Sequence, residues 1–361
     1  MTGKGRKVGT VGWSPFRAVC LALVLGLGPA CAATTPTPPP PEETLVVLNA
    51  GGGSLTLLPI THPGPPTSMP LDPGILPTAL ATRGVRALVT SETGNQVVVL
   101  DLAVEMPERT LVLEHTPGNG VIFNDSMAYV VAPLANLATR IHLGTGDTAS
   151  VSIGQTPVAA AVARGRVFVL NSNVALPCAG PTPCVLGESW LTVIDPDRNL
   201  VIDSIGLPGP GNGKALLAGG DGLLYSLDAG DGTQPGRLTV VDPVTRTELG
   251  SFGGFGILPE SLAGDGRERL FVISVSEGLM EFNTRTRRVV RGAGSGIPLQ
   301  DARAAAVDGD GQIYAVESGG CTFPGVGRIR VFRPDLTESR IVPAGLCSTA
   351  AGIVRLPPAG N

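Results

Sequence analysis

The sequence is poor in charge, and lysine is almost missing from it. Charged residues make up 16% of the 361 residues, and lysine occurs only at positions 4, 7 and 214. The densest basic cluster, three arginines between positions 285 and 288, fits the solvated face of a turn and a strand. The sequence contains no basic stripe, so nucleic acids and anionic lipid surfaces are excluded as expected partners.

Common catalytic motifs are missing too. The sequence has no C-x-x-C-H haem motif, no G-x-S-x-G nucleophile elbow and no Walker loop. Its three histidines, His62, His115 and His142, do not pair at a metal-binding spacing, and we expect them to be ordinary surface residues. No sustained amphipathic helical period follows residue 30, which excludes helix-rich folds.

Turn residues and apolar residues are abundant instead. The chain has 50 Gly and 33 Pro, and 43% of its residues are hydrophobic. This combination is typical of many short buried strands joined by turns, and it disfavours disorder. By length alone the chain suits two or three domains, but a repeat fold of this size can form one body.

A repeated unit organises most of the chain. Residues 85–113 contain three β-rich runs, "ALVTS", "QVVVLD" and "RTLVL", and a Gly-Asn turn signal separates the first two. The pattern predicts a three-stranded antiparallel meander. The chain contains seven copies of this unit, spaced at intervals of 41 to 53 residues, with middle strands ending at Pro59, Asp101, His142, Asp195, Asp242, Asn283 and Arg333. That period is typical of four-stranded propeller blades.

The fourth strand of each blade is expected just before its meander. Runs of small residues such as "TPVAAAVARG" stand there and suit the crowded strands around a propeller axis. The first copy lacks such a run, but "TAAGIVRLPP" near the C-terminus has no meander of its own. We therefore predict an all-β, seven-bladed β-propeller over residues 45–361, closed by the C-terminal strand completing the N-terminal blade.

These repeats resemble a known family. The runs "LVVLN" and "VFVLN", together with "LTVIDP", are similar to the YVTN family of β-propeller repeats, and the resemblance covers residues 45–356. It implies a propeller fold. It does not imply one activity, because similar repeats occur in bacterial surface proteins, in binding proteins and in lactonase-like enzymes.

The N-terminus carries the features of an export signal. Basic residues precede the apolar run "AVCLALVLGLG", which is too short to span a membrane, and small residues follow. "LGPAC" ending at Cys31 resembles a lipobox, although an ordinary cleavage site at Ala30 to Ala32 is the alternative. We predict a signal peptide over 1–31, a Pro-rich tether over 32–44, and a lipoprotein of the cell envelope whose lipid anchor is its contact with the membrane.

Four cysteines remain beyond the signal and the lipidation site. They are Cys178, Cys184, Cys321 and Cys347, an even number in an exported chain. Four cysteines allow three pairings. The short spacing in "CAGPTPC" favours Cys178 with Cys184, which leaves Cys321 with Cys347.

The sequence "DGDG" at residues 308–311 invites a calcium interpretation. Two carboxylates stand two positions apart, but the further oxygen ligands of a calcium loop are missing. Asp-Gly turns also recur in other repeats without the second carboxylate. We therefore expect a hairpin turn between the first two strands of a blade.

One face of the predicted ring collects the insertions. Residues 176–187, 228–236 and 319–327 fall between the second and third strands of their blades, and 61–74 is expected to connect two blades on the same side. The residues ending the second strands should lie nearby, and four of them have side chains suited to a cation or to sugar hydroxyls: Asn49, Asn171, Asp228 and Glu317. The alternative is that these side chains satisfy loop backbone groups.

Two function classes follow. The first is a non-catalytic, monomeric binding or interaction module, without a cofactor, for a protein or glycan of the cell envelope. The second is a metal-assisted, lactonase-like hydrolase at the mouth of the axial channel, with Asp228 and Glu317 as ligands of a divalent cation or as acid and base. The absence of catalytic motifs favours the binding module.

Overall fold

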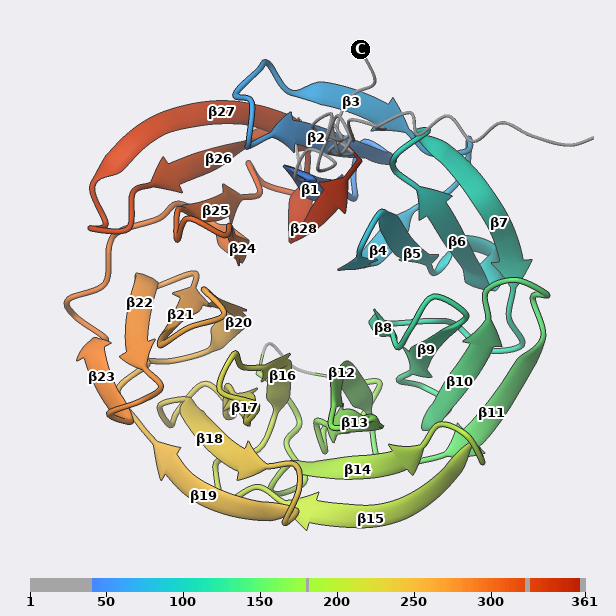
Figure 1. Cartoon of the computed structure of the whole chain (residues 1–361). Coiled ribbons are helices and arrows are strands. Elements are labelled where there is room, and N and C mark those ends of the chain that lie inside the picture. Colours follow the sequence, from blue (N-terminus) through green and yellow to red (C-terminus); the bar gives the residue numbers. More distant parts are fainter. Residues whose placement is uncertain (1–40, 180–181, 322–324, 358–361) are drawn as a thin grey trace, which may run out of the picture. The chain divides into compact units, whose positions relative to one another are not determined.

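The chain beyond its N-terminal segment forms a ring of antiparallel sheets. A computed structural model describes residues 41–179, 182–321 and 325–357. Within these ranges, 28 strands build seven four-stranded sheets arranged around an axis (Figure 1). The predicted all-β, seven-bladed β-propeller is confirmed. The predicted signal peptide and most of the tether lie outside the described residues, and β1 begins at Glu42, inside the range 32–44 assigned to the tether.

Each blade runs from an inner strand at the axis to an outer strand at the rim. From the inside outward, blade 1 consists of β28 (Ser348–Leu356), β1 (Glu42–Asn49), β2 (Ser54–Pro59) and β3 (Thr67–Pro70). Blade 2 consists of β4 (Pro77–Arg83), β5 (Arg86–Ser91), β6 (Gln96–Asp101) and β7 (Met106–Val112), with the short 3-10 turn η1 (Thr93–Asn95). Blade 3 consists of β8 (Gly120–Ile122), β9 (Met127–Ala132), β10 (Leu137–His142) and β11 (Thr148–Ser152).

The remaining four blades repeat this order. Blade 4 consists of β12 (Pro157–Ala163), β13 (Arg166–Asn171), β14 (Trp190–Asp195) and β15 (Leu200–Gly206). Blade 5 consists of β16 (Gly213–Ala218), β17 (Leu224–Asp228), β18 (Arg237–Asp242) and β19 (Thr247–Phe252). Blade 6 consists of β20 (Pro259–Gly264), β21 (Arg269–Ser274), β22 (Gly278–Asn283) and β23 (Arg288–Arg291). Blade 7 consists of β24 (Ala302–Val307), β25 (Ile313–Glu317), β26 (Val326–Phe332) and β27 (Glu338–Leu346).

The core lies between neighbouring blades. Second strands such as β1 are apolar on both faces, because each blade packs against a neighbour on either side. One cluster joins Leu55 and Leu57 of blade 1 to Ala87 and Val89 of blade 2, and six similar clusters join the other neighbours around the ring. A fully buried Leu or Val side chain stabilises the fold by about 1.5 to 3 kcal/mol. These repeated interfaces hold the ring together.

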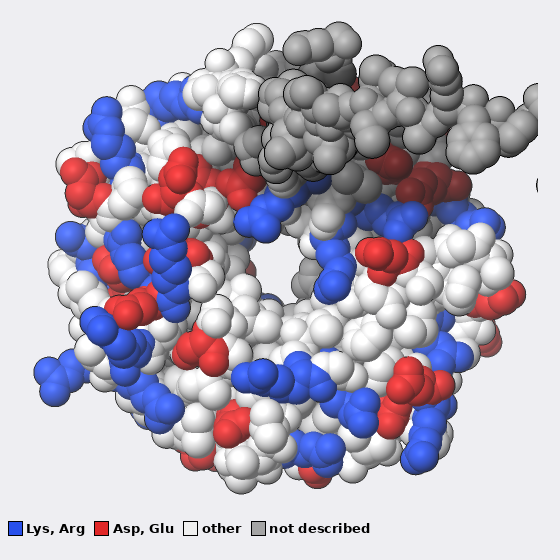
Figure 2. Space-filling model, in the orientation of Figure 1, with Lys and Arg blue, Asp and Glu red and all other residues white. Residues whose placement is uncertain are grey.

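The ring closes as predicted. The C-terminal strand β28 pairs antiparallel with β1, from Glu42 opposite Leu356 to Asn49 opposite Ser348. The space-filling view along the axis shows the central opening, and basic and acidic side chains are interspersed on the face shown (Figure 2).

The middle strand of each predicted meander is the third strand of its blade, counted from the axis. In six blades this strand ends at the predicted residue, and in blade 7 β26 ends one residue early, at Phe332. The expectation for residues 61–74 was wrong, because their centre forms β3, the outer strand of blade 1. Only the stretch after β3 connects two blades. Prolines limit β3 to four residues, since proline cannot donate to a ladder, and this hid the strand in the sequence.

The two predicted disulfides and the Asp-Gly turn are confirmed. Cys178 pairs with Cys184 and Cys321 with Cys347, with Cα separations of 5.6 and 4.7 Å. Asp308 lies in the turn between β24 and β25, where its carboxylate accepts hydrogen bonds from the Tyr314 hydroxyl (2.8 Å) and from backbone N–H groups of the turn.

Candidate functional site

The four residues predicted from the ends of the second strands are buried. Asn49, Asn171, Asp228 and Glu317 each end the second strand of a blade, and none is more than 1% exposed. Their hydrogen-bonding environments differ.

Asn49 is satisfied by its own surroundings. Its amide nitrogen donates to the hydroxyls of Ser54 (3.2 Å) and Thr56 (2.9 Å). Its carbonyl oxygen accepts from the Gly345 backbone N–H (2.9 Å) and from the Ser348 hydroxyl (2.8 Å). These bonds tie the first blade to the closing strand, which supports the structural alternative for this residue.

Glu317 is held by its own blade. Its carboxylate accepts the Gln300 backbone N–H (2.7 Å), pairs with the Arg328 guanidinium, and lies 3.5 Å from Arg330. Asp228 belongs to blade 5, so blade 6 separates the two carboxylates that we paired in the hydrolase hypothesis.

Asn171 is only partly satisfied. Its amide nitrogen donates to the Thr192 hydroxyl (2.8 Å) and to the Trp190 carbonyl (3.1 Å). Its buried carbonyl oxygen accepts no hydrogen bond from the described residues.

Asp228 has the most unusual environment of the four. Neither of its carboxylate oxygens accepts a hydrogen bond from the described residues. Burial raises the pKa of Asp228 to about 7, and the charge of Glu188 adds to this rise. The nearby Ser189 hydroxyl opposes part of the rise, but it already contacts the Ser172 carbonyl (3.4 Å) and the Gly213 N–H (3.0 Å). Asp228 therefore keeps its proton to a higher pH than an exposed aspartate does.

The arrangement of metal-ligating side chains does not support the metal hypothesis. Over the described ranges, no group of three His, Cys, Asp or Glu side chains lies close enough to hold a metal ion.

Most of the polar residues that line the axis come from bulges in the inner strands. In six blades the pairing of the inner with the second strand skips one residue close to the start of the inner strand. In blade 3, Asn119 takes the same place, because Val131 bonds to both Gly118 and Asn119. A bulge re-aims a side chain, and here it supplies one per blade. The bulge residues are Thr78, Asn119, Val158, Lys214, Glu260, Arg303 and Thr349.

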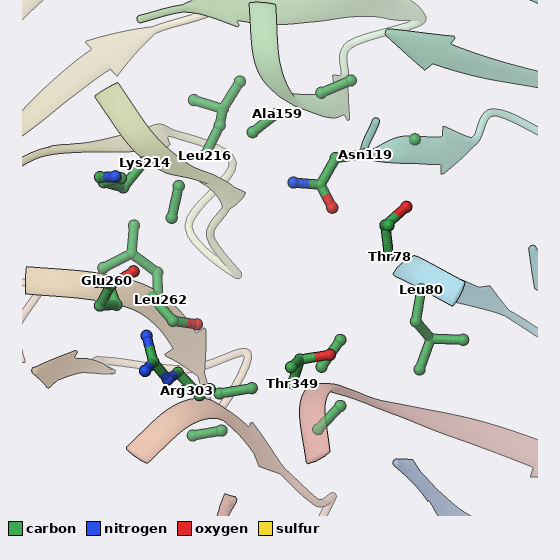
Figure 3. Close-up of a pocket in the computed structure, with 18 residues that line it drawn as sticks. Thr78, Leu80, Asn119, Ala159, Lys214, Leu216, Glu260, Leu262, Arg303 and Thr349 are labelled. Atoms are coloured by element: carbon green, nitrogen blue, oxygen red, sulfur yellow. The ribbon is translucent and has the colours of Figure 1, made fainter. Parts of the chain in front are cut away.

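Six of these residues line an axial cavity of about 410 Å³ (Figure 3). We call them the polar collar: Thr78, Asn119, Lys214, Glu260, Arg303 and Thr349. Side chains such as Leu80, Leu216 and Leu262 also line the cavity, so it combines polar and apolar walls. Its volume lies in the range of small-molecule sites, about 300 to 1,000 Å³.

A groove of about 610 Å³ adjoins the collar. It shares Thr78 and Asn119 with the axial cavity. Farther out it is lined by Pro133 and by two exposed leucines, Leu134 (68% exposed) and Leu176 (45%). The groove lies on the face where the second strands end, which is also the face of the three insertions.

The sequence held a signal for the collar that the periodicity argument missed. Six of the inner strands are runs rich in small residues, yet the second position of each carries a larger side chain, in "PT", "PV", "GK", "PE", "AR" and "ST". Strict alternation would place that residue between blades. In five of these six strands the bulge residue lines the axial cavity instead, and in the sixth Val158 lines the adjoining groove.

Comparison with known proteins gives the fold and nothing finer. No protein-family model matches the chain, and no curated protein matches it. A Kuenenia stuttgartiensis hydrazine synthase structure is similar with a TM-score of 0.64 at 14% identity, covering 86% of this chain and 100% of that one. A functionally unknown protein from Desulfotomaculum acetoxidans is similar with a TM-score of 0.64 at 14% identity, covering 87% and 99%. At this identity the likeness shows the fold alone, that of the seven-bladed β-propellers.

Proposed function

We propose that this protein is an exported β-propeller of YVTN-type repeats that binds a protein partner of the cell envelope on its insertion-bearing face. The observation that carries the proposal is the groove beside the polar collar, with Leu134 and Leu176 exposed on its wall. Apolar side chains gathered at a concave surface favour a protein partner over a glycan. Glycan binding is an outcome of the test below.

The site environment favours binding over the hydrolase alternative. Glu317, one of the two carboxylates on which the hydrolase depends, is already paired with Arg328. Asp228 is buried, and it lines neither the axial cavity nor the groove. No observation therefore favours catalysis by this pair.

Export and anchoring are part of the same proposal. The two disulfides are compatible with an oxidising compartment. No helix in the described part of the chain is long and apolar enough to cross a membrane. Cys31 lies outside the described residues. If Cys31 carries the lipid, wild-type protein should sediment with membranes and Cys31→Ser should appear in the soluble fraction. A soluble wild-type chain beginning at Ala33 would contradict the lipoprotein assignment.

The partner surface can be tested with a matched pair of positions. Leu134 lies on the groove wall, whereas Val104 (61% exposed) lies in the turn between β6 and β7, at the opposite end of the strands. A photo-crosslinking residue at 134 should capture one envelope protein in cells, and the same residue at 104 should not. With the purified partner, Leu134→Asp should raise the Kd at least tenfold, while Val104→Asp leaves it unchanged.

Three outcomes would overturn the proposal. They are equal capture at both positions, unchanged affinity of Leu134→Asp for the captured protein, and binding that is confined to envelope glycans on an array.

A further inference from the structure

The groove beside the polar collar continues to the rim of the ring. At its inner end it shares Thr78 and Asn119 with the axial cavity, and both residues lie on one side of that cavity (Figure 3). At its outer end it shares Thr116 and Leu134 with a pocket of about 370 Å³, which Glu114 also lines. Glu114 follows the outer strand of blade 2. We call the two connected pockets the radial groove, because together they cross the insertion-bearing face from the axis to the rim.

The length of the radial groove suits a short extended segment of a protein chain. The groove follows the end of blade 2 across its four strands, from β4 at the axis to β7 at the rim. Neighbouring strands lie about 4.8 Å apart and each extended residue spans about 3.3 Å, so about four or five residues cover this width. An extended segment of that length can therefore contact the groove from end to end.

Unpaired backbone groups line the radial groove. The chain between β7 and β8 contributes Thr116, Pro117 and Gly118 to the inner pocket and His115 to the outer one. Among the described residues, the backbone N–H groups of His115 and Thr116 and the carbonyl of Thr116 form no hydrogen bond. Proteins commonly bind extended peptides through main-chain donors and acceptors of this kind. The groove therefore offers hydrogen-bonding partners to the backbone of a bound segment.

The loops of the insertion-bearing face carry charges of one sign. These loops join each second strand to the third and each blade to the next, and their sequences contain no lysine or arginine. They contain seven acidic residues, which are Asp72, Glu92, Glu114, Glu188, Asp231, Glu277 and Asp301. The loops at the other end of the strands contain seven arginines, at positions 164, 198, 246, 267, 285, 287 and 333. The two faces of the ring therefore differ in charge, and the loops around the groove attract cations.

Two of these acidic residues lie in the radial groove. Glu92 lines the inner pocket and Glu114 the outer pocket. The Glu114 side chain is 88% exposed, and its ion-pair partner among the described residues is the neighbouring imidazole of His115, at 3.9 Å. The lysine and arginine side chains at this end of the strands, such as Lys214 and Arg328, come from blades 5 to 7, and within the described chain none pairs with Glu92 or Glu114. Both carboxylates are therefore open to the cations of a partner.

We propose that the radial groove binds an extended, basic segment of the protein partner, with arginine or lysine on either side of a large apolar residue. The cations pair with Glu92 and Glu114. The apolar side chain packs against Leu134 and Leu176, which are exposed on the groove wall. The backbone of the segment pairs with the unpaired groups of the chain between β7 and β8. This inference rests on the proposed function and names the chemistry that the partner presents to the groove.

The first test is the binding of capped pentapeptides to the full mature chain, measured by fluorescence polarisation. The probes are the series Arg-x-Leu-x-Arg, whose three fixed side chains face one side of an extended chain, with x varied over all residues. The series Glu-x-Leu-x-Glu and Arg-x-Ser-x-Arg are the counterparts. At least one basic peptide should bind with a Kd below about 1 mM, and both of its counterparts should bind at least fivefold more weakly. The inference is overturned if no basic peptide reaches this affinity, or if either counterpart binds within fivefold of the basic peptide.

Variants then locate the site. Glu92→Gln together with Glu114→Gln removes both charges and should weaken binding of the best basic peptide at least fivefold. Asp72→Asn removes an exposed charge of the same face outside the groove and should leave the affinity unchanged. Glu92→Arg together with Glu114→Arg should reverse the preference, so that the acidic counterpart binds more tightly. A loss below fivefold in the folded double glutamine variant, or a basic preference in the double arginine variant, would overturn the assignment.

The captured partner separates this inference from the proposed function. Its affinity should fall as NaCl rises from about 50 to about 300 mM, because salt screens exposed charge pairs, and the double glutamine variant should lose most of this dependence. A partner that needs Leu134 but is insensitive to salt and to both substitutions would leave the partner surface in place and overturn the basic segment. Peptide binding that depends on Glu92 and Glu114, without capture of any envelope protein, would support the groove and contradict the proposed function.

Discussion

The Asn49 carbonyl oxygen accepts a hydrogen bond of 2.8 Å from the Ser348 hydroxyl, although 299 positions separate the two residues. Both residues are completely buried. The bond lies where β1 of the first blade meets β28, so the first and last strands of the propeller are joined by a buried side-chain contact as well as by their ladder. Closure of the ring therefore includes a buried side-chain hydrogen bond in addition to the strand pairing.

Removal of the closing strand should open the ring. Deletion of residues 348–361 takes away β28 and leaves β1 with an unpaired edge, which is a template for association with other chains. We expect a lower melting temperature and oligomers in light scattering after size exclusion. Deletion of residues 357–361 leaves β28 intact and should behave like the wild type. A stable monomer lacking 348–361 would contradict the closure.

The two disulfides should differ in their contribution to stability. By the chain-entropy estimate, a loop of 26 residues contributes about 3 kcal/mol and a loop of 6 residues about 2 kcal/mol. Replacing Cys321 and Cys347 with serine should therefore lower the free energy of unfolding more than replacing Cys178 and Cys184. Urea titration of the two double variants measures this order, and the reverse order would show that the closing bridge does not restrain the ring.

Asp228 should make the protein less stable as the pH rises. Its pKa is about 7 in the folded protein and near 3.8 when unfolded, so the folded state binds more protons between these values. The contribution of the protonated Asp228 carboxyl to the free energy of unfolding is fully present below about pH 4, and it is lost as the pH rises through about 7. By pH 8 the loss relative to Asp228→Asn should be on the order of 4 kcal/mol.

Urea unfolding from pH 5 to 8 measures this difference. The gap between wild type and Asp228→Asn should widen with pH, while the exposed control Asp125→Asn should follow the wild type. A constant gap would mean that the Asp228 carboxyl does not titrate in this range.

Asp308 should stabilise its turn without a metal ion. Its buried carboxylate accepts the Tyr314 hydroxyl (2.8 Å) and the Gln312 backbone N–H (2.8 Å), so Asp308→Ala should cost about 2 to 3 kcal/mol. Asp310, two positions later, is exposed, and Asp310→Ala should cost under 0.5 kcal/mol. Thermal unfolding with and without 1 mM calcium measures both. Calcium stabilisation that both variants abolish would restore the calcium interpretation.

The sequence alone determined the blades, the closure and the disulfides, because each depends on a local pattern. Alternation within a run and turn residues at its ends define a strand and its hairpin, as in residues 85–113. The closure followed from counting strands, since one run at the C-terminus had no meander and the first meander had no inner strand. The pairing of Cys321 with Cys347 followed once the short Cys178 loop was closed.

Only the tertiary structure decided which side chains can meet a ligand. Asn49 and Asp228 end equivalent strands, yet Asn49 is satisfied by Gly345 and Ser348 from the far end of the chain, whereas no described neighbour bonds to Asp228. The collar depends on bulges that turn residues such as Arg303 and Thr349 to the axis. Whether a buried polar atom forms a hydrogen bond depends on residues far away in the sequence. A local sequence pattern contains no information about those residues.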